Sequence, residues 1–238
     1  MGDLGMLQTA KTTMRQVGVL STVQVGTPRR YQVADVLSEA DRSWRTSFFR
    51  VPSPDRRRLH MTHLEGNQQA DTKNHGGAEQ AVLMYSAAHY AVWQAELGRS
   101  DIGPGGFGEN FTIEELTEAT ACIGDIYQVG DARIQVSGPR YPCVKISRRW
   151  GIDGLTERVG ATGRTGWYCR VLQEGEIEPG MSIVLVDRPF PQYSIALIND
   201  FTHHRNHDLD RAHELAACPL LPEWWQRLVV ARASGREW

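Results

Sequence analysis

The chain has 238 residues, of which 41% are hydrophobic and 23% are charged, the composition of a soluble globular protein with a buried core. Twenty-six basic and 28 acidic residues give a net charge of -2, which excludes a general attraction to nucleic acid or an anionic membrane, so any anion site has to be a local pocket. No stretch reaches the roughly 18 apolar residues that span a bilayer. Residues 1–16 lack the apolar core of a signal peptide. We therefore expect a cytoplasmic protein with an N-terminal tail over residues 1–16.

Residues 17–189 carry mainly strand and turn signals. Val17–Val25 contains β-branched residues in a loose alternation, and Leu59–Leu64 alternates apolar and polar residues, as half-buried strands do. Residues 126–136 predict a hairpin that turns at Gly130-Asp131. Residues 167–186 predict a second hairpin, in which Trp167–Leu172 pairs with Met181–Val186.

Three helices interrupt these strands. Residues 86–97 predict a helix with Ser86 as its N-cap and Gly98 as its stop. Val144–Trp150 and Gly154–Val159 predict two short helices. Strands separated by turns and decorated by helices favour a mainly β fold with α, built as a β-barrel over residues 17–189.

A small C-terminal three-helix domain is expected over residues 190–238. The helical segments are Tyr193–Phe201, Leu209–Ala217 and Pro222–Arg232. We expect Trp224 and Trp225 to pack inside this extension.

The cysteines are far apart in the sequence, at Cys122, Cys143, Cys169 and Cys218, so four separate thiols are expected rather than a paired-cysteine zinc site. Pro139 and Pro142 flank Arg140 and exclude regular helix or central strand just before Cys143. Arg140 and Lys145 are cations that favour a thiolate, the form that binds soft metals. The alternative is that Cys143 is a small buried apolar residue.

Two glycine loops are further candidates. In Lys73–Val82, Gly76 and Gly77 would let backbone N–H groups bind an anion, assisted by Lys73 and His75. The residues by themselves favour an ordinary loop there. Gly103–Thr112 holds four glycines next to Glu109 and Asn110, polar groups suited to a heterocycle; a flexible surface loop is the competing interpretation.

Taken in order, these segments resemble the MOSC domain, the C-terminal domain of molybdenum cofactor sulfurases, and within it the stand-alone bacterial YiiM-like subgroup with a three-helix extension. The resemblance spans nearly the whole chain. The segments that carry it are Gly66–Asp71, His75–Gly77, Gly106–Asn110, Val136–Ser137 leading into Cys143, Gly163–Tyr168 and Arg170–Leu172.

The resemblance implies a MOSC-type barrel that holds a molybdenum–molybdopterin cofactor, with Cys143 bound to molybdenum. It implies Cys143, Arg140 and His75 as catalytic residues. The implied cofactor-binding residues are Lys73, His75, Gly76, Gly77, Asn110, Arg140, Lys145 and Arg170. Two positions depart from the family pattern: Arg50 stands where a lysine is common, and Met181 where an aspartate often follows Gly180.

The activity implied is reduction of N-hydroxylated compounds, such as 6-hydroxylaminopurine, to amines. The chain has no Rossmann fingerprint and no CxxC cluster, so a separate flavin or haem reductase is expected to donate the electrons. No nucleic-acid or membrane partner is expected, and a homodimer is compatible with the sequence. Two alternatives stay open: a sulfur carrier that uses a Cys143 persulfide, and a non-catalytic molybdopterin-binding module.

Overall fold

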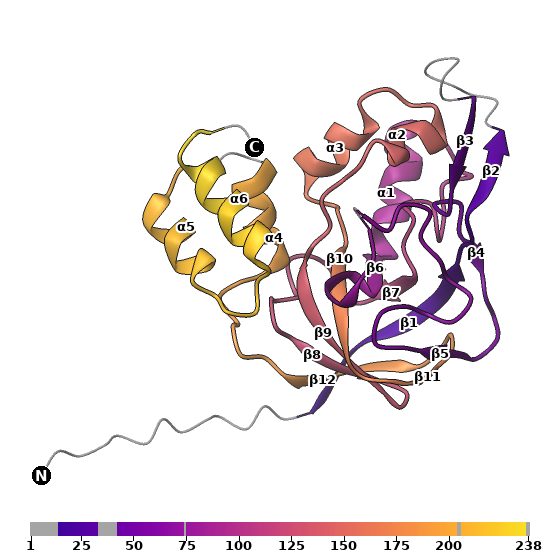
Figure 1. The fold of residues 1–238 in the computed structure, drawn as a ribbon, viewed down its shortest axis with the longest axis horizontal. Coiled ribbons are helices and arrows are strands. Elements are labelled where there is room, and N and C mark those ends of the chain that lie inside the picture. Colours follow the sequence, from indigo (N-terminus) through magenta and orange to yellow (C-terminus); the bar gives the residue numbers. More distant parts are fainter. Residues whose placement is uncertain (1–13, 33–41, 74, 204–205, 237–238) are drawn as a thin grey trace, which may run out of the picture.

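A closed β-barrel forms the centre of the protein (Figure 1). The structure is a computed structural model and describes residues 14–32, 42–73, 75–203 and 206–236. Strands hydrogen-bond in the order β12-β8-β9-β10-β6-β7-β1, and β1 pairs with β12 to close the ring. Only β6 and β7 are parallel among these pairs. The barrel strands are β1 (Arg15–Val25), β6 (Val82–Ser86), β7 (Phe111–Glu114), β8 (Ile126–Val129), β9 (Ala132–Pro139), β10 (Trp167–Gln173) and β12 (Ser182–Asp187).

The predicted barrel and its first hairpin are confirmed. Strands β8 and β9 pair antiparallel from Ile126–Gln135 to Val129–Ala132, across the turn at Gly130. Alternate residues of β8 point inward, because Tyr127 and Val129 are buried while their neighbours are partly exposed. Most of residues 1–16 lie outside the described part of the chain, and residues 15 and 16 belong to β1.

Two strand predictions were wrong. The hairpin predicted over residues 167–186 does not form, because β10 pairs with β9 and β6 whereas β12 pairs with β8 and β1 to close the barrel. Leu59–Leu64 is not one strand: Leu59 ends β5 and forms an isolated antiparallel bridge with Leu64. Both leucines are buried at a tight turn, so the sequence shows the same alternation of apolar and polar residues as a half-buried strand.

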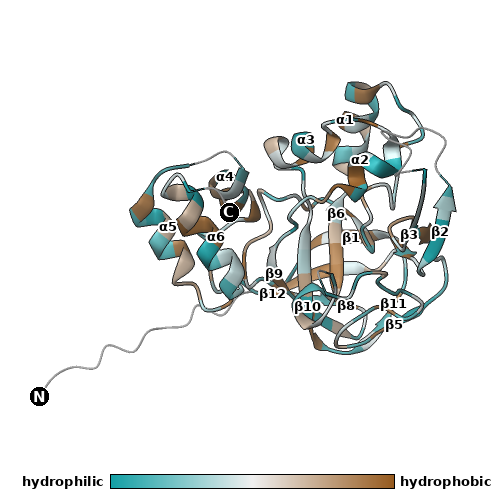
Figure 2. Ribbon diagram, turned by 45° about the horizontal axis from the view of Figure 1, so that its top comes forward, coloured by the Kyte–Doolittle hydropathy of each residue, from teal (hydrophilic) through white to brown (hydrophobic). Residues whose placement is uncertain are grey.

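Four short strands border the barrel. Strands β2 (Arg29–Gln32) and β3 (Ser43–Thr46) form a two-stranded ribbon, and β2 is hydrophilic (Figure 2). Strand β4 (Val51–Pro52) pairs with the end of β1. Strand β5 (Arg57–Leu59) pairs with β11 (Gly175–Ile177).

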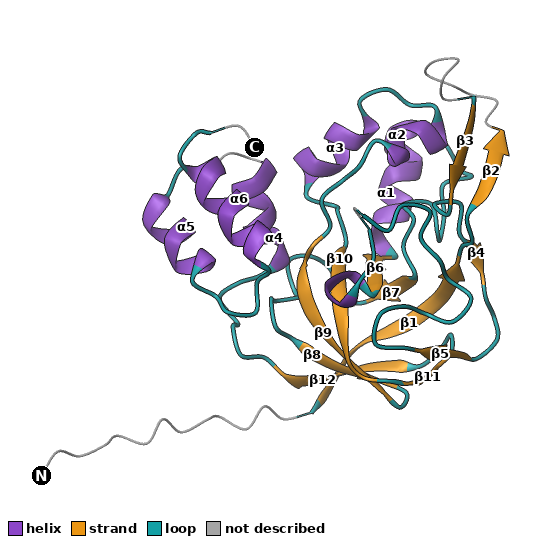
Figure 3. Cartoon of the chain, viewed as in Figure 1, coloured by secondary structure: helices purple, strands orange, loops and turns teal. Residues whose placement is uncertain are grey.

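Three helices gather at the top of the barrel in the view of Figure 3, namely α1 (Ala88–Leu97), α2 (Lys145–Trp150) and α3 (Leu155–Thr162). The predicted stop of α1 is confirmed, because Gly98 adopts the left-handed conformation. Its predicted N-cap was wrong. Ser86 is the buried last residue of β6 and pairs with Ile113, so Ala87 precedes the helix instead.

The last three helices lie beside the barrel (Figure 1): α4 (Ile195–His203), α5 (Leu209–Ala216) and α6 (Glu223–Ala233). Their buried residues, including Ile198, Leu215 and Leu228, belong to the same hydrophobic cluster as the barrel core. Since burial of apolar surface is the main stabilising term, this continuous core holds α6 against the barrel. No helix of the described residues is long and apolar enough to cross a membrane.

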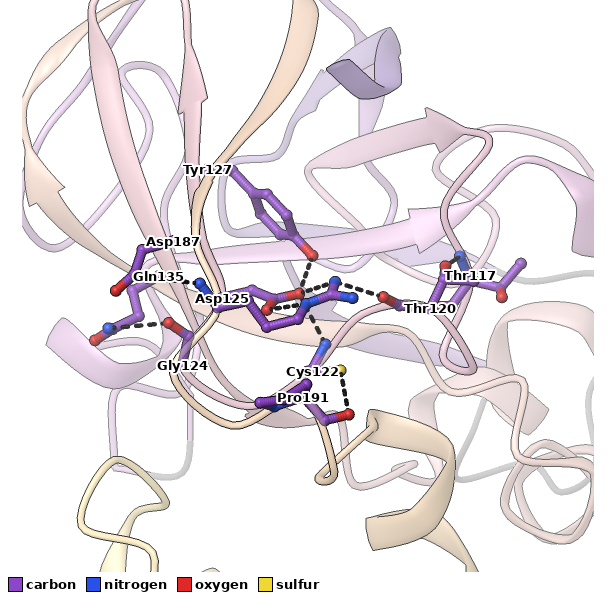
Figure 4. A network of polar contacts seen from close by, with 10 residues as sticks. Thr117, Thr120, Cys122, Gly124, Asp125, Tyr127, Gln135, Asp187 and Pro191 are labelled. Carbon is purple, nitrogen blue, oxygen red and sulfur yellow. Dashed lines mark hydrogen bonds and ion pairs between the residues drawn. The ribbon is translucent and has the colours of Figure 1, made fainter. Parts of the chain in front are cut away.

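A buried polar network links the start of β8 to the segment after β12. Asp125 is fully buried and accepts hydrogen bonds from Arg188, from the Tyr127 hydroxyl at 2.8 Å and from the Cys122 backbone N–H at 2.9 Å (Figure 4). The same Arg188 donates to the carbonyl of Thr120 at 2.8 Å. This network fixes the point at which the chain leaves the barrel toward α4.

Candidate functional site

A cavity of about 570 Å³ opens where the barrel, its connecting loops and α6 meet. Its volume falls within the range of small-molecule and cofactor sites. The lining residues come from six segments far apart in the sequence: Thr46, Ser47, Phe48, Arg50, Gln69, His75, Gly76, Gln80, Leu83, Gly108, Asn110, Arg140, Tyr141, Pro142, Cys143, Lys145, Tyr168, Trp224 and Leu228.

Cys143 is the one partly exposed thiol and lines this cavity, whereas the other three cysteines are buried. It follows β9 and precedes α2, and its carbonyl accepts hydrogen bonds from Ile146 N–H at 3.0 Å and from the Thr156 hydroxyl at 3.1 Å. The expected four separate thiols are confirmed. Both bonds anchor the backbone of Cys143, so the side chain is held at the cavity wall.

Two arginines, the buried Arg140 and the partly buried Arg50, line the cavity with positive charge. Arg140 is 3% exposed and directs Nη2 to a point 4.0 Å from the Sγ of Cys143. Nη1 of Arg140, and Nε and Nη1 of Arg50, have no hydrogen-bond partner among the described residues. Burial lowers the pKa of Arg50 to about 10, so its guanidinium is still charged at neutral pH. Buried charged donors without partners are costly, and an anion in the cavity would satisfy them.

Lys145 and His75 also line the cavity. Burial, together with the positive charge of Lys145, lowers the pKa of His75 to about 4. The imidazole is therefore neutral at pH 7, a hydrogen-bonding group rather than a cation. The described residues that line the cavity include no carboxylate, so its charged lining residues are the cations Arg50, Arg140 and Lys145. The nearby carboxylates of Asp71 and Glu109 act on His75 and on Arg50, respectively.

Asn110 and Gly108 shape the cavity wall. The Asn110 amide joins two strands: Oδ1 accepts from Leu83 N–H at 3.2 Å and Nδ2 donates to the Gln24 carbonyl at 3.3 Å. Gly108 has φ +77°, and a Cβ there would lie 2.6 Å from the Phe48 ring. A larger residue at 108 would therefore displace Phe48 from the cavity wall.

The structure brings together six of the predicted site residues and leaves three aside. His75, Gly76, Asn110, Arg140, Cys143 and Lys145 line the cavity. Lys73 and Gly77 are exposed and are not among its lining residues. Arg170 is not a lining residue either: it pairs with Glu79 at 2.5 Å and donates to the carbonyl of Leu220 at 2.8 Å. It thus joins the loop after His75 to the segment before α6.

Sequence reasoning did not include several lining residues in the site. In the sequence, Arg50 was distinguished only by its departure from the family pattern, and Tyr168 only as the last residue of the motif Gly163–Tyr168. Burial raises the pKa of Tyr168, so its hydroxyl keeps its proton. Trp224 and Leu228 reach the cavity from α6, and no local signal places a residue of the last helix near Cys143.

These residues fit a molybdenum–molybdopterin group. The unpartnered N–H groups of Arg50 and Arg140 suit its phosphate, because guanidinium groups bind phosphate through paired hydrogen bonds. The partly exposed Cys143 suits its metal, since thiolate is a soft ligand. Among the described residues, no group of three or more His, Cys, Asp or Glu side chains could hold a metal ion by itself. A metal at this site would depend on the ligands that the cofactor brings.

Comparison with known proteins agrees with this geometry. The family described as "MOSC domain" matches residues 71–184. YiiM of Escherichia coli is 33% identical over 177 residues, covering 73% of this chain and 78% of that protein. A protein of Gibberella moniliformis named "Reductase" is 38% identical over 166 residues, covering 68% of this chain but 28% of that longer protein.

Solved structures extend the likeness to the three-helix extension. The crystal structure of YiiM from Geobacillus stearothermophilus matches with a TM-score of 0.72 and 31% identity, covering 93% of this chain and 100% of that chain. That coverage includes the barrel and helices beyond it. The chain therefore belongs to the MOSC-domain family, among its YiiM-like members.

Proposed function

We infer that this protein holds a molybdenum–molybdopterin cofactor through Cys143 and reduces N-hydroxylated compounds, such as 6-hydroxylaminopurine, to amines. One observation carries the proposal: the single partly exposed thiol lies 4.0 Å from a buried arginine, in a cavity whose arginine N–H groups lack partners. Membership of the MOSC-domain family supports a molybdenum-associated reductase.

The bound cofactor would supply the two-electron chemistry at its metal. Arg50 and Arg140 would hold its phosphate, and Cys143 would bind the metal through Sγ. Because His75 is neutral at pH 7, its imidazole would accept or donate one hydrogen bond without adding charge.

The overall reaction, R–NHOH + 2H⁺ + 2e⁻ → R–NH₂ + H₂O, consumes two protons. Tyr168 lines the cavity and keeps its proton at Oη because burial raises its pKa. Lys145 lines the same cavity, and its side chain ends in the hydrogen-bond donor Nζ. These two side chains, with Arg140 as a hydrogen-bond donor to the departing oxygen, are the groups that would protonate the leaving oxygen and the product nitrogen.

The electrons would come from a separate flavin or haem reductase. The longer Gibberella relative, named "Reductase", contains a region similar to this chain, and that region makes up 28% of the length of the relative.

The first test is the molybdenum and pterin content of the wild type and of Cys143→Ala, made in a host with active cofactor synthesis. Elemental analysis should find molybdenum near one per chain in the wild type and little in the variant. The holoprotein should then reduce 6-hydroxylaminopurine when given a competent reductase. Protein without either component, and with a mass increase of about 32 Da on Cys143, would instead support a sulfur carrier. Full cofactor content without turnover of any N-hydroxylated compound would support a binding module.

A further inference from the structure

The cavity has two chemically distinct parts. Its cations come from the segment before β4, from the end of β9 and from α2. Helix α6 contributes two lining residues, Trp224 and Leu228, and both are apolar. Phosphate binding needs the cations, so the apolar surface of α6 is left for a different part of a ligand.

Trp224 belongs to a row of aromatic rings. Its ring centroid lies 4.2 Å from that of Trp225, and the Trp225 centroid lies 6.3 Å from that of Tyr141. Trp225 is 2% exposed and packs on β9, where a Cβ at Gly138 would lie 2.9 Å from its indole nitrogen. Trp225 is thus anchored to the barrel, and it supports both neighbouring rings.

This row of aromatic rings extends to the cavity wall that contains Cys143. Tyr141 lines the cavity two residues before Cys143 and is 43% exposed. Trp224 lines the same cavity from α6, although sequence reasoning expected it to pack inside the three-helix extension. A partly exposed indole facing a cavity is an apolar surface with a preference for flat aromatic partners.

We propose that Trp224 is the specificity-determining residue of the substrate subsite and stacks on the planar ring of an N-hydroxylated aromatic base. This rests on the proposed reductase function and deepens it: the barrel binds the anionic cofactor, and α6 selects aromatic substrates over small aliphatic hydroxylamines. Base–aromatic stacking tolerates different ring types because every base has a π-face. The subsite therefore selects for planarity rather than for one base.

The test compares Trp224→Ala and Trp224→Phe with Arg227→Ala, which removes an exposed side chain from the same helix. Holoprotein is titrated with adenine by calorimetry, and KM and kcat are measured for 6-hydroxylaminopurine and for N-methylhydroxylamine. We expect Trp224→Ala to weaken adenine binding and to raise the KM for the purine roughly 5- to 150-fold, the range for loss of one base–aromatic stack. Trp224→Phe should retain most of the affinity. The kcat/KM for N-methylhydroxylamine should not change in Arg227→Ala, and in Trp224→Ala it should fall far less than the kcat/KM for the purine.

Two results would overturn the proposal. Equal losses for the aromatic and the aliphatic substrate would mean that Trp224 is structural. Loss of pterin from Trp224→Ala, by fluorescence of the oxidised pterin, would mean that the indole holds the cofactor. The adenine titration needs no turnover, so it separates this proposal from the reductase function. If the wild type binds adenine but has no reductase activity, and Trp224→Ala weakens that binding, the aromatic subsite is supported and the reductase function is rejected. A wild type that binds no adenine and reduces no aromatic hydroxylamine rejects both.

Discussion

Arg140 and Cys143 form a pair at the cavity wall, with Nη2 of the arginine 4.0 Å from the Sγ of the cysteine. The backbone N–H of Arg140 donates to the Gly166 carbonyl at 3.0 Å, while the carbonyl of Cys143 is held by α2 and α3. Two independently anchored backbones therefore hold the guanidinium near the thiol. The second terminal nitrogen of Arg140, Nη1, remains available to a ligand.

Cys143 should be the first cysteine to react with iodoacetamide in protein stripped of its ligand. The other three thiols are buried, and burial raises the pKa of Cys122 to about 11 and also raises the pKa values of Cys169 and Cys218. Thiolate is the reactive form of cysteine, so we expect Cys143 to be alkylated roughly tenfold faster, or more, than the other three cysteines. Peptide mass spectrometry gives the order of labelling. Protection of Cys143 in cofactor-loaded protein is the matched control, and prior labelling of Cys218 would contradict the prediction.

Arg50→Gln should weaken anion binding in the cavity. Loss of one hydrogen bond to a charged group costs about 1.5–3 kcal/mol, or roughly tenfold to 150-fold in affinity. Calorimetric titration with inorganic phosphate measures the change, and the fluorescence of oxidised pterin measures cofactor retention. Arg50→Lys should lose less affinity for the anion, because lysine keeps the positive charge although it lacks the planar guanidinium group.

The control for this loss of charge is Arg45→Gln, on the exposed surface of β3. Both substitutions remove one positive charge, but Arg45 is not among the residues that line the cavity. Equal weakening by the two variants would mean that phosphate responds to net charge and not to the donors of Arg50.

Stability should fall as the pH is lowered from about 6.5 to about 4, partly because of His75. Its folded pKa is about 4, below the ordinary value of 6.5, so the unfolded chain binds more protons in this window and acid favours unfolding. Asp71, Lys145, Arg140 and Arg50 are the charged groups that act on the imidazole. His75→Gln should flatten the dependence of the urea midpoint on pH. An unchanged slope in His75→Gln would rule out this origin.

Arg188→Met should destabilise the protein by about 3–5 kcal/mol, the cost of leaving a buried charge without its partner. Asp125 is fully buried, and its hydrogen bonds with Arg188 raise the pKa of that arginine. Urea unfolding followed by tryptophan fluorescence measures the loss. Arg56→Met breaks an exposed ion pair with Glu178 instead and should cost far less stability, because water screens exposed ion pairs. Similar losses in the two variants would show that the Asp125 network has no special role.

The sequence by itself determined the local features of this protein. β-branched residues and a Gly130 turn predicted the β8–β9 hairpin, and the apolar periodicity of the last 45 residues or so predicted three helices. Pro142 identified the irregular segment that ends at Cys143, whereas Pro139 is the last residue of β9 and pairs with Trp167. The order of motifs identified the family. These signals are local because backbone propensity, turn geometry and burial period act over a few residues.

The tertiary structure decided which of these segments meet. Closure of the barrel by β12 on β1 brings Arg50 and Arg140 into one cavity although 90 positions separate them. The same packing leaves Lys73 outside the cavity, although it is only two positions from the lining residue His75, and places Trp224 of α6 in the wall that contains Cys143. Side chains so distant in sequence meet only when a common core forms. Which pairs then approach depends on strand order and helix packing, and no local pattern encodes either.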